Sequence, residues 1–353
     1  MDGKQKVLVG MSGGVDSSAA ALLLKNQGYD VTGCTLRLRG SRLKNSREGA
    51  EKDIEDARRV CGSLEIPHIV LDLTEQFCRL VVDEFTQEYR RGRTPNPCVT
   101  CNRTIKFGAM LDYAEKQGFD FIATGHYVRK EYSSESGRWQ LFRADSGKDQ
   151  SYVLYGLTQQ QLAHALFPLY GLEKEQVRGL AREKGLPVAE KGDSMEICFV
   201  PDDNHTAFIE NYTGEAEEEG YFISPEGIRL GKHKGISHYT IGQRKGLGIA
   251  LGRPVYVTAI DEAARSVTLS PEVPLTAEFT AARINFVSLP PTKLPFNAVI
   301  KIRYQAPPVP ARVEPLDNGR ARILPEKPVK AVTPGQSVVF YDGGCLLGGG
   351  VIE

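Results

Sequence analysis

The segment Val9–Ser18 reads VGMSGGVDSS and carries more information about the fold than any other stretch of this chain. It follows the apolar run Val7-Leu8-Val9 and precedes the helix-forming run Ala19–Lys25, so the sequence predicts a strand, a glycine turn and the start of a helix. Gly13 and Gly14 allow the backbone to take positive φ and to come close to a ligand. Because the turn offers amide N–H groups and serine hydroxyls at a helix N-terminus, it is typical of a site for phosphate or pyrophosphate.

The turn differs from the phosphate loop of Walker nucleotidases, because no lysine follows its glycines. An ordinary glycine-rich turn in an α/β domain is the alternative interpretation, but SGGxDS directly after a strand is far more specific than SGG alone. The segment resembles the PP-loop of the ATP pyrophosphatase superfamily. That resemblance implies cleavage of ATP between the α- and β-phosphates and activation of an oxygen by adenylation. It also implies that Gly10–Ser17 cradles pyrophosphate and that Asp16 orders the loop or a Mg²⁺ ion.

The size and composition of the chain are those of a globular protein with more than one domain. Its 353 residues predict two or three domains, and 41% hydrophobic and 25% charged residues are ordinary values. No apolar run is long enough to span a membrane and no signal-peptide pattern precedes the first strand, so we expect a cytoplasmic protein without a membrane partner. The 44 basic and 44 acidic residues balance, so overall charge gives no support for a nucleic-acid partner.

Apolar strands alternate with amphipathic helices over about the first two hundred residues. The expected strands are Val7–Gly10, Val31–Leu38, His68–Leu71 and Phe121–Thr124. The expected helices are Ser17–Asn26, Gly49–Leu64, Thr74–Arg90 and Ile105–Gln117. This order predicts an α/β fold with a parallel sheet and helices on both faces, and a ligand at the carboxyl ends of the strands.

The character of the sequence changes after about residue 205, where glycine, proline and alternating β-branched residues replace the helical patterns. Pro254–Ala259 and Ser266–Leu269 read as two strands joined by a turn. Beyond residue 280 the expected strands are Ala298–Tyr304, Ala311–Glu314, Ala321–Leu324, Ser337–Tyr341 and Leu346–Ile352. Short strands at this spacing predict a small β-barrel or sandwich.

The chain has seven cysteines, an odd number that argues against a disulfide framework and favours metal binding or sulfur chemistry. Cys98 and Cys101 form a CxxC pair in the segment GRTPNPCVTCNRTIKF, which its two prolines predict to be an extended loop. Cys198 lies far away in SMEICFV. A CxxC pair alone is typical of zinc, iron–sulfur and redox sites alike, and no second CxxC or CxxH completes a zinc site. Cys101 precedes a predicted helix and has Arg103 and Lys106 nearby, which favours a thiolate.

Several ordered motifs then narrow the interpretation. GMSGGVDSS, GRTPNPxxxCN, IKF, ATGHY, KDQSY, a distal ICF and YTIGQRKGLG resemble those of the bacterial tRNA-specific 2-thiouridylase family, over nearly the whole chain from Val9 to the C-terminal YDGGCLLGGGVI. The resemblance implies ATP-dependent 2-thiolation of the wobble uridine in tRNAs for Lys, Glu and Gln. It implies a PP-loop adenylation domain at 1–205, a small central α+β domain at 206–275 and a tRNA-contacting β-barrel at 276–353. The implied partners are tRNA and a sulfur-donor protein, either a persulfide relay or a cysteine desulfurase, and we expect a monomer.

The resemblance also assigns roles to single residues. Cys101 matches the nucleophile of the family, and Cys198 matches the cysteine that receives sulfur as a persulfide. The implied ATP contacts are Gly10, Met11, Ser12, Gly13, Gly14, Val15, Asp16, Ser17, Leu36 and Gly125. The residues implied to face the target base are Asn96, Pro97 and Cys98. The residues that match tRNA-contacting positions are His126, Lys148, Asp149, Gln150, Arg303, Tyr304 and Gln336.

The implied chemistry begins with transfer of AMP to the C2 oxygen of uridine, which turns a poor leaving group into a good one. Persulfide sulfur on Cys198 then attacks C2, and Cys101 can attack the sulfur–sulfur bond. AMP leaves and 2-thiouridine remains, with a Cys101–Cys198 disulfide to be reduced. Since two distant cysteines must meet, one of their loops must move, and the base must turn out of its stack.

Cys98 departs from the family pattern NPDxxC, in which an Asp stands at this position. One interpretation makes Cys98 a spare or resolving thiol beside Cys101. The other makes Cys98, Cys101 and Cys198 the ligands of a 4Fe–4S cluster with one open iron that binds sulfide. Two further hypotheses stay open, a PP-loop amide-forming synthetase that needs no cysteines and a non-enzymatic RNA- or metal-binding protein. ATP is the expected cofactor, with Mg²⁺, although no metal-ligand set is evident beyond the loop.

Overall fold

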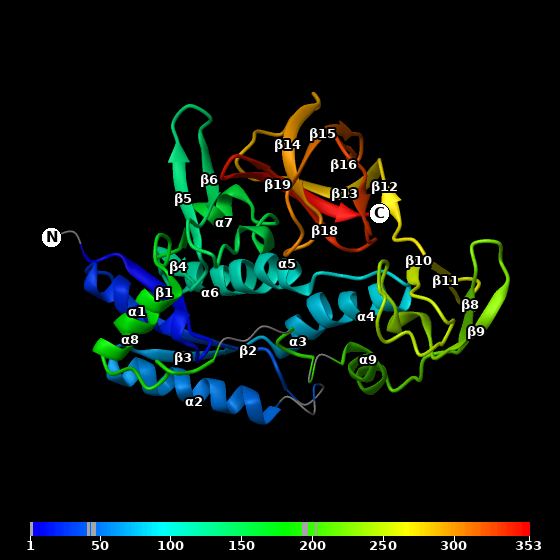
Figure 1. Ribbon diagram of the computed structural model, residues 1–353. Helices are drawn as coiled ribbons and strands as arrows, with labels where there is room; N and C mark the ends of the chain where they lie inside the picture. The colour runs from blue at the N-terminus through cyan, green and yellow to red at the C-terminus, as the bar shows by residue number, and fades with distance from the viewer. Residues whose placement is uncertain (1–2, 41–42, 44–46, 193–196, 201, 203) are drawn as a thin grey trace.

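A parallel sheet forms the N-terminal part of the computed structural model, which describes residues 3–40, 43, 47–192, 197–200, 202 and 204–353 (Figure 1). The strands follow the order β3-β2-β1-β4-β7, and each neighbouring pair is parallel. They are β1 (Lys6–Gly10), β2 (Asp30–Arg37), β3 (His68–Asp72), β4 (Phe121–Ala123) and β7 (Ala165–Leu166). The predicted α/β class and the four predicted strands are confirmed.

Helices cover both faces of this sheet, because the side chains of β1 alternate between two apolar cores. Val7 and Val9 join one core and Leu8 joins the other. The first core packs against α1 (Val15–Asn26), α2 (Arg47–Ser63) and α8 (Lys174–Glu183). The second packs against η3 (Asn102–Ala109), α6 (Met110–Lys116) and α7 (Gln159–Ala163). Figure 1 shows the two helical layers on opposite sides of the strands.

A long helical run covers residues 74–90, as the sequence predicts. It consists of α3 (Thr74–Phe77), the π-helical turn η2 (Cys78–Val82) and α4 (Asp83–Arg90). Phe77, Phe85, Phe199 and Phe208 form a separate apolar cluster around it, with ring centroids 5.2 to 6.1 Å apart in the contacting pairs. This cluster attaches the chain next to Cys198 to the N-terminal part.

The predicted extended loop over residues 92–107 is wrong beyond Asn96. The helix α5 (Pro97–Cys101) begins directly after Asn96 and continues into η3 and α6. Pro97 stands in the first turn, where a helix needs no N–H donor, so this proline starts the helix instead of breaking it. Cys98 and Cys101 are therefore helical residues.

The C-terminal part is a β-barrel that also takes in a hairpin from the N-terminal part. Its strands are β13 (Phe279–Phe286), β14 (Phe296–Lys301), β15 (Val309–Leu316), β16 (Arg320–Pro325), β18 (Ser337–Asp342) and β19 (Cys345–Ile352). Pairing of β13 with β19 closes these strands into a ring. The hairpin of β5 (Val128–Ser133) and β6 (Arg138–Arg143) joins the edge of β19, so the barrel is built onto the N-terminal part.

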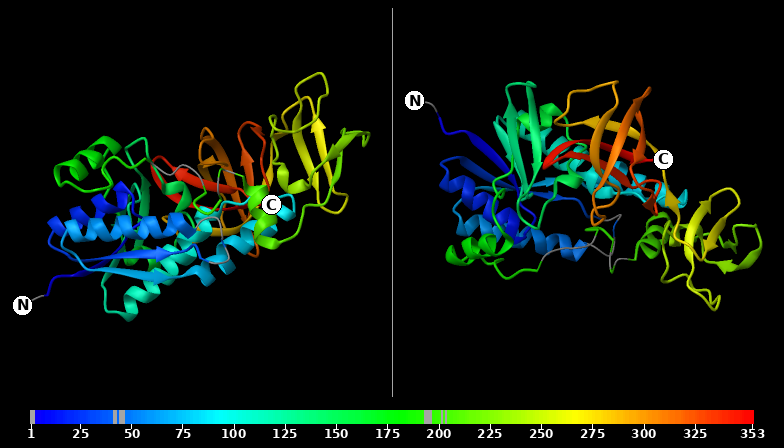
Figure 2. Two further views of the ribbon diagram at one scale, coloured as in Figure 1. Left: turned by 90° about the horizontal axis from the view of Figure 1, so that it is seen from below. Right: turned by 45° about the horizontal axis from the view of Figure 1, so that its top comes forward.

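A small sheet with the order β10-β11-β8-β9 forms the middle of the chain. Its strands are β8 (Gly220–Ile223), β9 (Arg229–His233), β10 (Tyr256–Asp261) and β11 (Ser266–Ser270), preceded by α9 (His205–Thr213). The remaining short elements are η4 (Ser151–Val153), η6 (Ile236–His238), β12 (Leu275–Thr276) and β17 (Val329–Lys330). Figure 2 shows the barrel between the N-terminal part and this small sheet.

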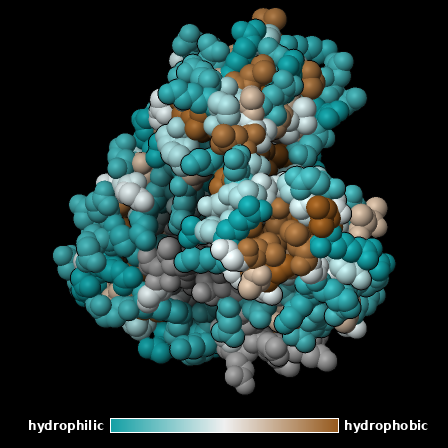
Figure 3. Space-filling view, turned by 45° about the vertical axis from the view of Figure 1, so that its right-hand side comes forward, coloured by the Kyte–Doolittle hydropathy of each residue, from teal (hydrophilic) through white to brown (hydrophobic). Residues whose placement is uncertain are grey.

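The described residues form a mostly hydrophilic surface, as the ordinary share of charged residues in the sequence predicts. The face in Figure 3 is hydrophilic over most of its area, with apolar side chains gathered in a few patches. Among the described residues, no helix is long and apolar enough to cross a membrane.

We predict that Arg303→Met lowers the free energy of unfolding by about 2 kcal/mol. The Nη2 of Arg303 donates to the carbonyls of Ile241 and Ala331 and to the Thr333 hydroxyl, at 3.0, 2.9 and 2.6 Å, so it ties the central sheet to the barrel. The measurement is urea unfolding. Arg312→Met on exposed β15 is the control, and it should cost less than about 0.5 kcal/mol. Equal losses of unfolding free energy in the two variants would contradict the stabilising role of the Arg303 hydrogen bonds.

Candidate active site

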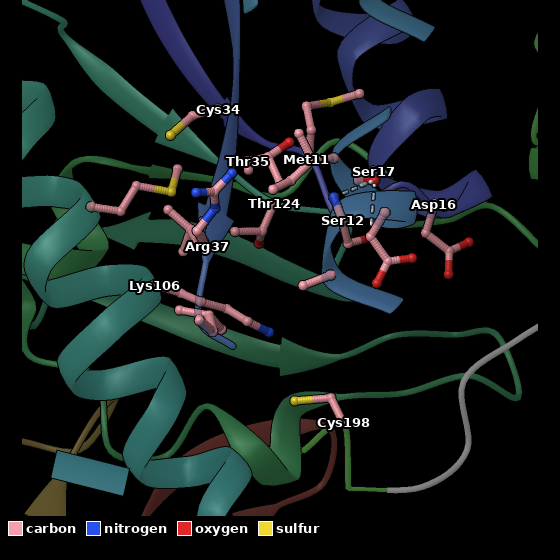
Figure 4. A pocket seen from close by; sticks show the side chains of 18 of the residues that line it. Met11, Ser12, Asp16, Ser17, Cys34, Thr35, Arg37, Lys106, Thr124 and Cys198 are labelled. Carbon is pink, nitrogen blue, oxygen red and sulfur yellow. Dashed lines mark hydrogen bonds between the residues drawn. The ribbon is translucent and has the colours of Figure 1, made fainter. Parts of the chain in front are cut away.

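A pocket of about 340 Å³ lies where β1, β2 and β4 end (Figure 4). This is the carboxyl edge of the parallel sheet, where the topology predicts a ligand. The residues after β1, at the end of β2 and after β4 contribute most of its wall, and α2, η3, Met110, Gln150 and Cys198 also contribute. The lining residues include Gly10, Met11, Ser12, Asp16, Ser17, Thr35, Leu36, Arg37, Arg39, Asp53, Lys106, Thr124, Gly125 and His126.

The glycine turn after β1 is held in shape by its own hydroxyls. The Ser17 and Ser18 hydroxyls both donate to the Gly14 carbonyl, at 3.1 and 2.8 Å. The Ser12 amide donates to the Ser17 hydroxyl at 3.2 Å. Gly14 caps α1 without a side-chain hydrogen bond, so the first amides of this helix point toward the loop as an anion site does.

Two glycines allow neighbouring backbones to touch this turn. Gly13 has φ +70, and a Cβ there would lie 2.6 Å from the Asp53 carbonyl oxygen on α2. A Cβ on Gly125 would lie 2.8 Å from the Asp16 carbonyl carbon. The turn is therefore packed directly between α2 and the segment after β4.

Asp16 is engaged by two partners from distant parts of the chain. Its carboxylate accepts hydrogen bonds from the Tyr127 hydroxyl at 2.7 Å and from Lys174 Nζ at 2.7 and 2.9 Å. Lys174 begins α8, so this ion pair ties the start of α1 to α8. Of the two roles expected for Asp16, these contacts favour ordering of the loop.

The implied ATP residues divide into two groups. Seven of them line the pocket, namely Gly10, Met11, Ser12, Asp16, Ser17, Leu36 and Gly125. Gly13, Gly14 and Val15 shape the turn and the helix start, and the Val15 side chain is buried in the core. The contact of each of these residues with ATP stays a prediction.

The sequence interpretation missed several charged residues of the pocket wall. Arg37 and Arg39 come from the end of β2 and the residues after it, Lys106 comes from η3, and Asp53 comes from α2. Arg37 ends the same strand as Leu36, so its place could have been inferred. Nothing in the sequence around Asp53 distinguishes it from the other acidic residues of α2.

All seven cysteines are free thiols in this structure. Cys34 and Cys198 line the pocket. Cys98 and Cys198 expose surface to solvent, whereas Cys101 is buried. The charge of Cys198 acts on the pKa of both Cys98 and Cys101, so the three sulfur atoms lie within electrostatic reach of one another.

The thiolate expected at Cys101 is wrong for this arrangement. Burial raises the pKa of the Cys101 thiol to about 12, and the nearby Lys106 ammonium opposes that rise only in part. Cys101 lies inside the continuous helical run of α5 and η3, so it gains nothing from a helix N-terminus. Desolvation by the surrounding protein likewise raises the pKa of Cys98 and of Cys198, and Lys106 lowers both.

Lys106 is the cation that these thiols share. Figure 4 shows its side chain extending into the pocket on the side where Cys198 lies. The pKa of His126 lies well below its ordinary value. Burial is the main cause, and the charge of the Lys106 ammonium is the second. A positive charge beside three thiols favours any step that forms a sulfur anion there.

The described part of the chain offers no ready metal site. Thiolates are the ligands that iron–sulfur clusters use, so Cys98, Cys101 and Cys198 have the right chemistry. Among the described residues, however, no group of three or more His, Cys, Asp or Glu side chains lies close enough together to hold a metal ion. A cluster would require the three thiols to approach one another further.

The residues implied to face the target base sit at the start of α5. Asn96 caps this helix and Pro97 is buried at its first turn. Cys98 follows and is exposed. This corner contacts the barrel, because Gln336 Nε2 donates to the Thr94 carbonyl at 3.1 Å.

The residues matched to tRNA contacts lie in different environments. His126 is buried in the pocket wall, and its Nδ1 lies 2.7 Å from the Thr124 hydroxyl. Gln150 also lines the pocket, and its Oε1 accepts from the Tyr127 amide at 3.1 Å. The structure therefore brings His126 and Gln150 together with the implied ATP residues.

The other members of that set make contacts within the protein. Asp149 accepts from the Ser151 amide and hydroxyl at 3.1 and 3.0 Å, which shapes its turn. Tyr304 is 45% exposed and donates to the Asp149 carbonyl at 2.9 Å. Arg303 connects the central part of the chain to the barrel, and Gln336 connects the barrel to the segment before α5. Lys148 is half-buried beside this turn.

Three family models match the chain in succession. The tRNA methyl transferase HUP domain matches residues 5–202, the tRNA methyl transferase PRC-barrel domain matches residues 206–271, and the aminomethyltransferase beta-barrel domain matches residues 276–352. The breaks between the matches fall near residues 205 and 275.

Curated relatives match the chain over its full length. A tRNA-specific 2-thiouridylase MnmA of Acetivibrio thermocellus is 47% identical over 99% of this chain and 99% of the relative. A protein of the same name from Clostridium perfringens is also 47% identical, over 99% of both chains. Another, from Geotalea uraniireducens, is 47% identical over 99% of this chain and 95% of the relative.

Gly13→Ala should lower the free energy of unfolding by about 2 kcal/mol, because alanine at positive φ is strained and its Cβ meets the Asp53 carbonyl. Gly14→Ala is the matched control. Gly14 has φ −107, and a Cβ there meets only the Ser12 hydroxyl at 3.4 Å, so it should cost less than about 0.5 kcal/mol. Urea unfolding of both variants tests this. A Gly13→Ala variant as stable as Gly14→Ala would overturn the description of the turn.

Lys106→Met should slow alkylation of Cys198 by iodoacetamide at pH 8 about tenfold, because it removes the cation that lowers the Cys198 pKa most, ahead of Arg39. The rate should rise with pH in both proteins, since below its raised pKa the thiol gains thiolate as pH rises. Peptide mass spectrometry measures the rate at Cys198 alone. Lys116→Met, on the exposed end of α6, is the control and should leave the rate unchanged. A rate unaffected by Lys106→Met would contradict the assigned role.

Proposed function

The chain belongs to the tRNA-specific 2-thiouridylase family, and from this premise we propose that it replaces the C2 oxygen of the wobble uridine in tRNA by sulfur, at the expense of ATP. The observation that carries the proposal is the meeting of the glycine turn and Cys198 in the wall of one pocket. The matching family models are named for methyl transfer, but a persulfide-forming cysteine beside an ATP loop is suited to sulfur transfer. An amide-forming synthetase would need no such cysteine.

In the first step the C2 oxygen attacks the α-phosphate of ATP, and pyrophosphate leaves. The turn Gly10–Ser17 supplies amide N–H groups to the departing pyrophosphate. Arg37, Arg39 and Lys106 line the same pocket and place positive charge beside the phosphates. The C2 oxygen then carries AMP and becomes a good leaving group.

In the second step sulfur replaces the activated oxygen. The outer sulfur of a Cys198 persulfide attacks C2 and AMP departs, which leaves Cys198 joined to the base through two sulfur atoms. Cys101 attacks the Cys198 sulfur, and the electron pair of the broken sulfur–sulfur bond passes to the base as 2-thiouridine. The product is a Cys101–Cys198 disulfide, which an external thiol must reduce before the next turnover.

The accessibility of the two cysteines fits this division of roles. Exposed Cys198 can receive sulfur from a donor protein, whereas buried Cys101 is protected from side reactions until Cys198 approaches. The neutral thiol of Cys101 loses its proton only when that approach brings the reacting sulfur close. The donor belongs to the class of persulfide-carrying proteins.

Cys98 has two alternative roles in this proposal. As a resolving or spare thiol it stands in helix α5 with its surface open to solvent. As a ligand of a 4Fe–4S cluster it would act with Cys101 and Cys198, and the cluster would supply sulfide bound to its open iron. The first role agrees better with the separation of the thiols in the described residues.

We propose that Mg²⁺ arrives with ATP. Among the described residues, the carboxylates that line the pocket are those of Asp16 and Asp53, and both are paired with cations. The phosphates and water therefore supply most of the Mg²⁺ ligands, as is usual for this ion.

The remaining proposals concern the tRNA and the setting of the enzyme. The domains are 1–205 for adenylation, 206–275 as the central unit and 276–353 as the barrel that contacts tRNA. Lys148 and Tyr304 lie near the surface and are proposed to contact tRNA, while Arg303 and Gln336 position the barrel. The protein is proposed to act as a monomer in the cytoplasm.

Single-turnover thiolation of an anticodon stem-loop with ATP tests the proposal in anaerobically purified protein. Cys198→Ala and Cys101→Ala should abolish 2-thiouridine formation with a persulfide donor, whereas Cys98→Ala should retain more than about half of the wild-type rate. Cys345→Ala, a half-buried cysteine of β19, is the control and should be fully active.

Iron and acid-labile sulfide are measured in the same samples. Absence of iron from active wild-type protein supports the persulfide route. Loss of iron and activity together in Cys98→Ala and Cys198→Ala would establish the cluster and overturn that route. Full activity of Cys198→Ala would contradict both.

A further inference from the structure

Asp53 stands at the junction of the glycine turn and the segment of Cys198. It lies on α2 and lines the pocket, and 34% of its side chain is exposed. Its Oδ2 accepts from Arg39 Nη2 at 2.6 Å, and its Oδ1 accepts from Lys191 Nζ at 3.0 Å. One carboxylate therefore holds two cations, one with each oxygen.

The two cations lead in opposite directions from Asp53. Lys191 Nζ also donates to the Gly13 carbonyl at 2.9 Å, so it reaches the glycine turn. Arg39 Nη1 donates to the Cys198 carbonyl at 3.4 Å, so it reaches the backbone of the sulfur-carrying residue. A continuous path of hydrogen bonds runs from Gly13 through Asp53 to Cys198.

The strengths of these contacts differ. The bond from Arg39 to Asp53 is a short charge-assisted contact, whereas 3.4 Å to the Cys198 carbonyl is near the limit for a hydrogen bond. Although partial burial opposes it, hydrogen bonding to Asp56 and Asp53 raises the pKa of Lys191, which keeps this lysine charged. The hydrogen bond from Arg39 to the Cys198 carbonyl is therefore the weakest of the path.

We infer that Asp53 is a positioning residue that couples occupation of the glycine turn to release of Cys198. The inference rests on the proposed function, in which the turn binds the phosphates of ATP and Cys198 carries the sulfur. A phosphate group in the pocket attracts Arg39, which lines it, and competes for the guanidinium with the neutral Cys198 carbonyl. Because a ligand shifts an equilibrium only through contacts that differ between two states, the Arg39–phosphate contact is the one that drives the shift.

The coupling gives the reaction an order. With the turn empty, Arg39 and Asp53 hold the Cys198 backbone in place, away from Cys101. With phosphate bound, Cys198 is free to approach first the activated base and then Cys101. Sulfur transfer then requires that ATP has bound, and the persulfide is not consumed when no ATP is present.

A merely structural ion-pair network makes a different prediction. Partly exposed salt bridges often contribute little to the stability of a fold, and their loss alone need not change the alkylation rate of Cys198. Asp56 offers a matched control, because it stands on the same helix and accepts from Lys191 at 2.9 Å, whereas Arg39 pairs with Asp53. A network that only holds α2 in place would respond alike to Asp53→Asn and Asp56→Asn.

The test uses the full-length protein, with inorganic pyrophosphate and Mg²⁺ as the probe of the phosphate site. Iodoacetamide alkylation of Cys198 is followed by peptide mass spectrometry, with and without saturating pyrophosphate. In the wild type pyrophosphate should speed alkylation about fivefold, within the usual range of coupling between two sites. In Asp53→Asn and Arg39→Gln pyrophosphate should change the alkylation rate by less than about 1.5-fold. This ratio is the readout, because the charges of Arg39 and Asp53 themselves shift the Cys198 pKa in opposite directions and so change the basal rates. Asp56→Asn should behave like the wild type.

The outcomes separate this inference from the proposed function. Calorimetric titration reports whether pyrophosphate binds at all, and a wild type that does not bind it would contradict the proposed role of the turn. Binding without any change in Cys198 alkylation would overturn the coupling alone. A pyrophosphate effect that is the same in Asp53→Asn as in the wild type, or equal responses of Asp53→Asn and Asp56→Asn, would also overturn it. Thermal unfolding of each variant confirms that it is folded.

Discussion

The burial of β1 between two apolar cores is the constraint on which the rest of the structure depends. Val7 and Val9 face one core and Leu8 faces the other, so a shift of the strand by one residue would move each side chain into the opposite core and disrupt the packing of both. Its pairing with β2 places Gly10 beside Cys34, and its pairing with β4 places Val9 beside Ala123. The glycine turn, the end of β2 and the segment after β4 therefore meet at one edge, and the pocket lies there.

The charges around this pocket come from parts of the chain that the fold brings together. The glycine turn has no lysine of its own, and the cations near it stand on β2, η3, α8 and the segment after α8. Lys174 holds Asp16, Lys191 holds Gly13, and Lys106 faces the thiols. The same arrangement that prepares the site for phosphates also lies beside Cys198, so nucleotide chemistry and sulfur chemistry share one electrostatic environment.

Local signals in the sequence predicted the sheet, its helices and the glycine turn well, because strand burial and turn chemistry depend on nearby residues. The same reasoning failed where tertiary packing decides. The sequence predicts that Pro97 belongs to an extended loop, but this proline starts a helix. The sequence also predicts a thiolate at Cys101, but that thiol is buried and its pKa is raised. The structural ties of Arg303, and the convergence of Arg39 and Lys191 on Asp53, join residues far apart in the chain. No pattern within one segment could have indicated them.

The central claim is that the pocket activates the uridine C2 oxygen by adenylation. Thiolation of an anticodon stem-loop that carries ¹⁸O at C2 of the wobble uridine tests this most directly, with mass spectrometry of the released nucleotide. The account predicts one ¹⁸O atom in AMP for each 2-thiouridine formed, because the bond from carbon to oxygen breaks after the oxygen has joined the α-phosphate. Recovery of the ¹⁸O in pyrophosphate, inorganic phosphate or water, with none in AMP, would contradict it.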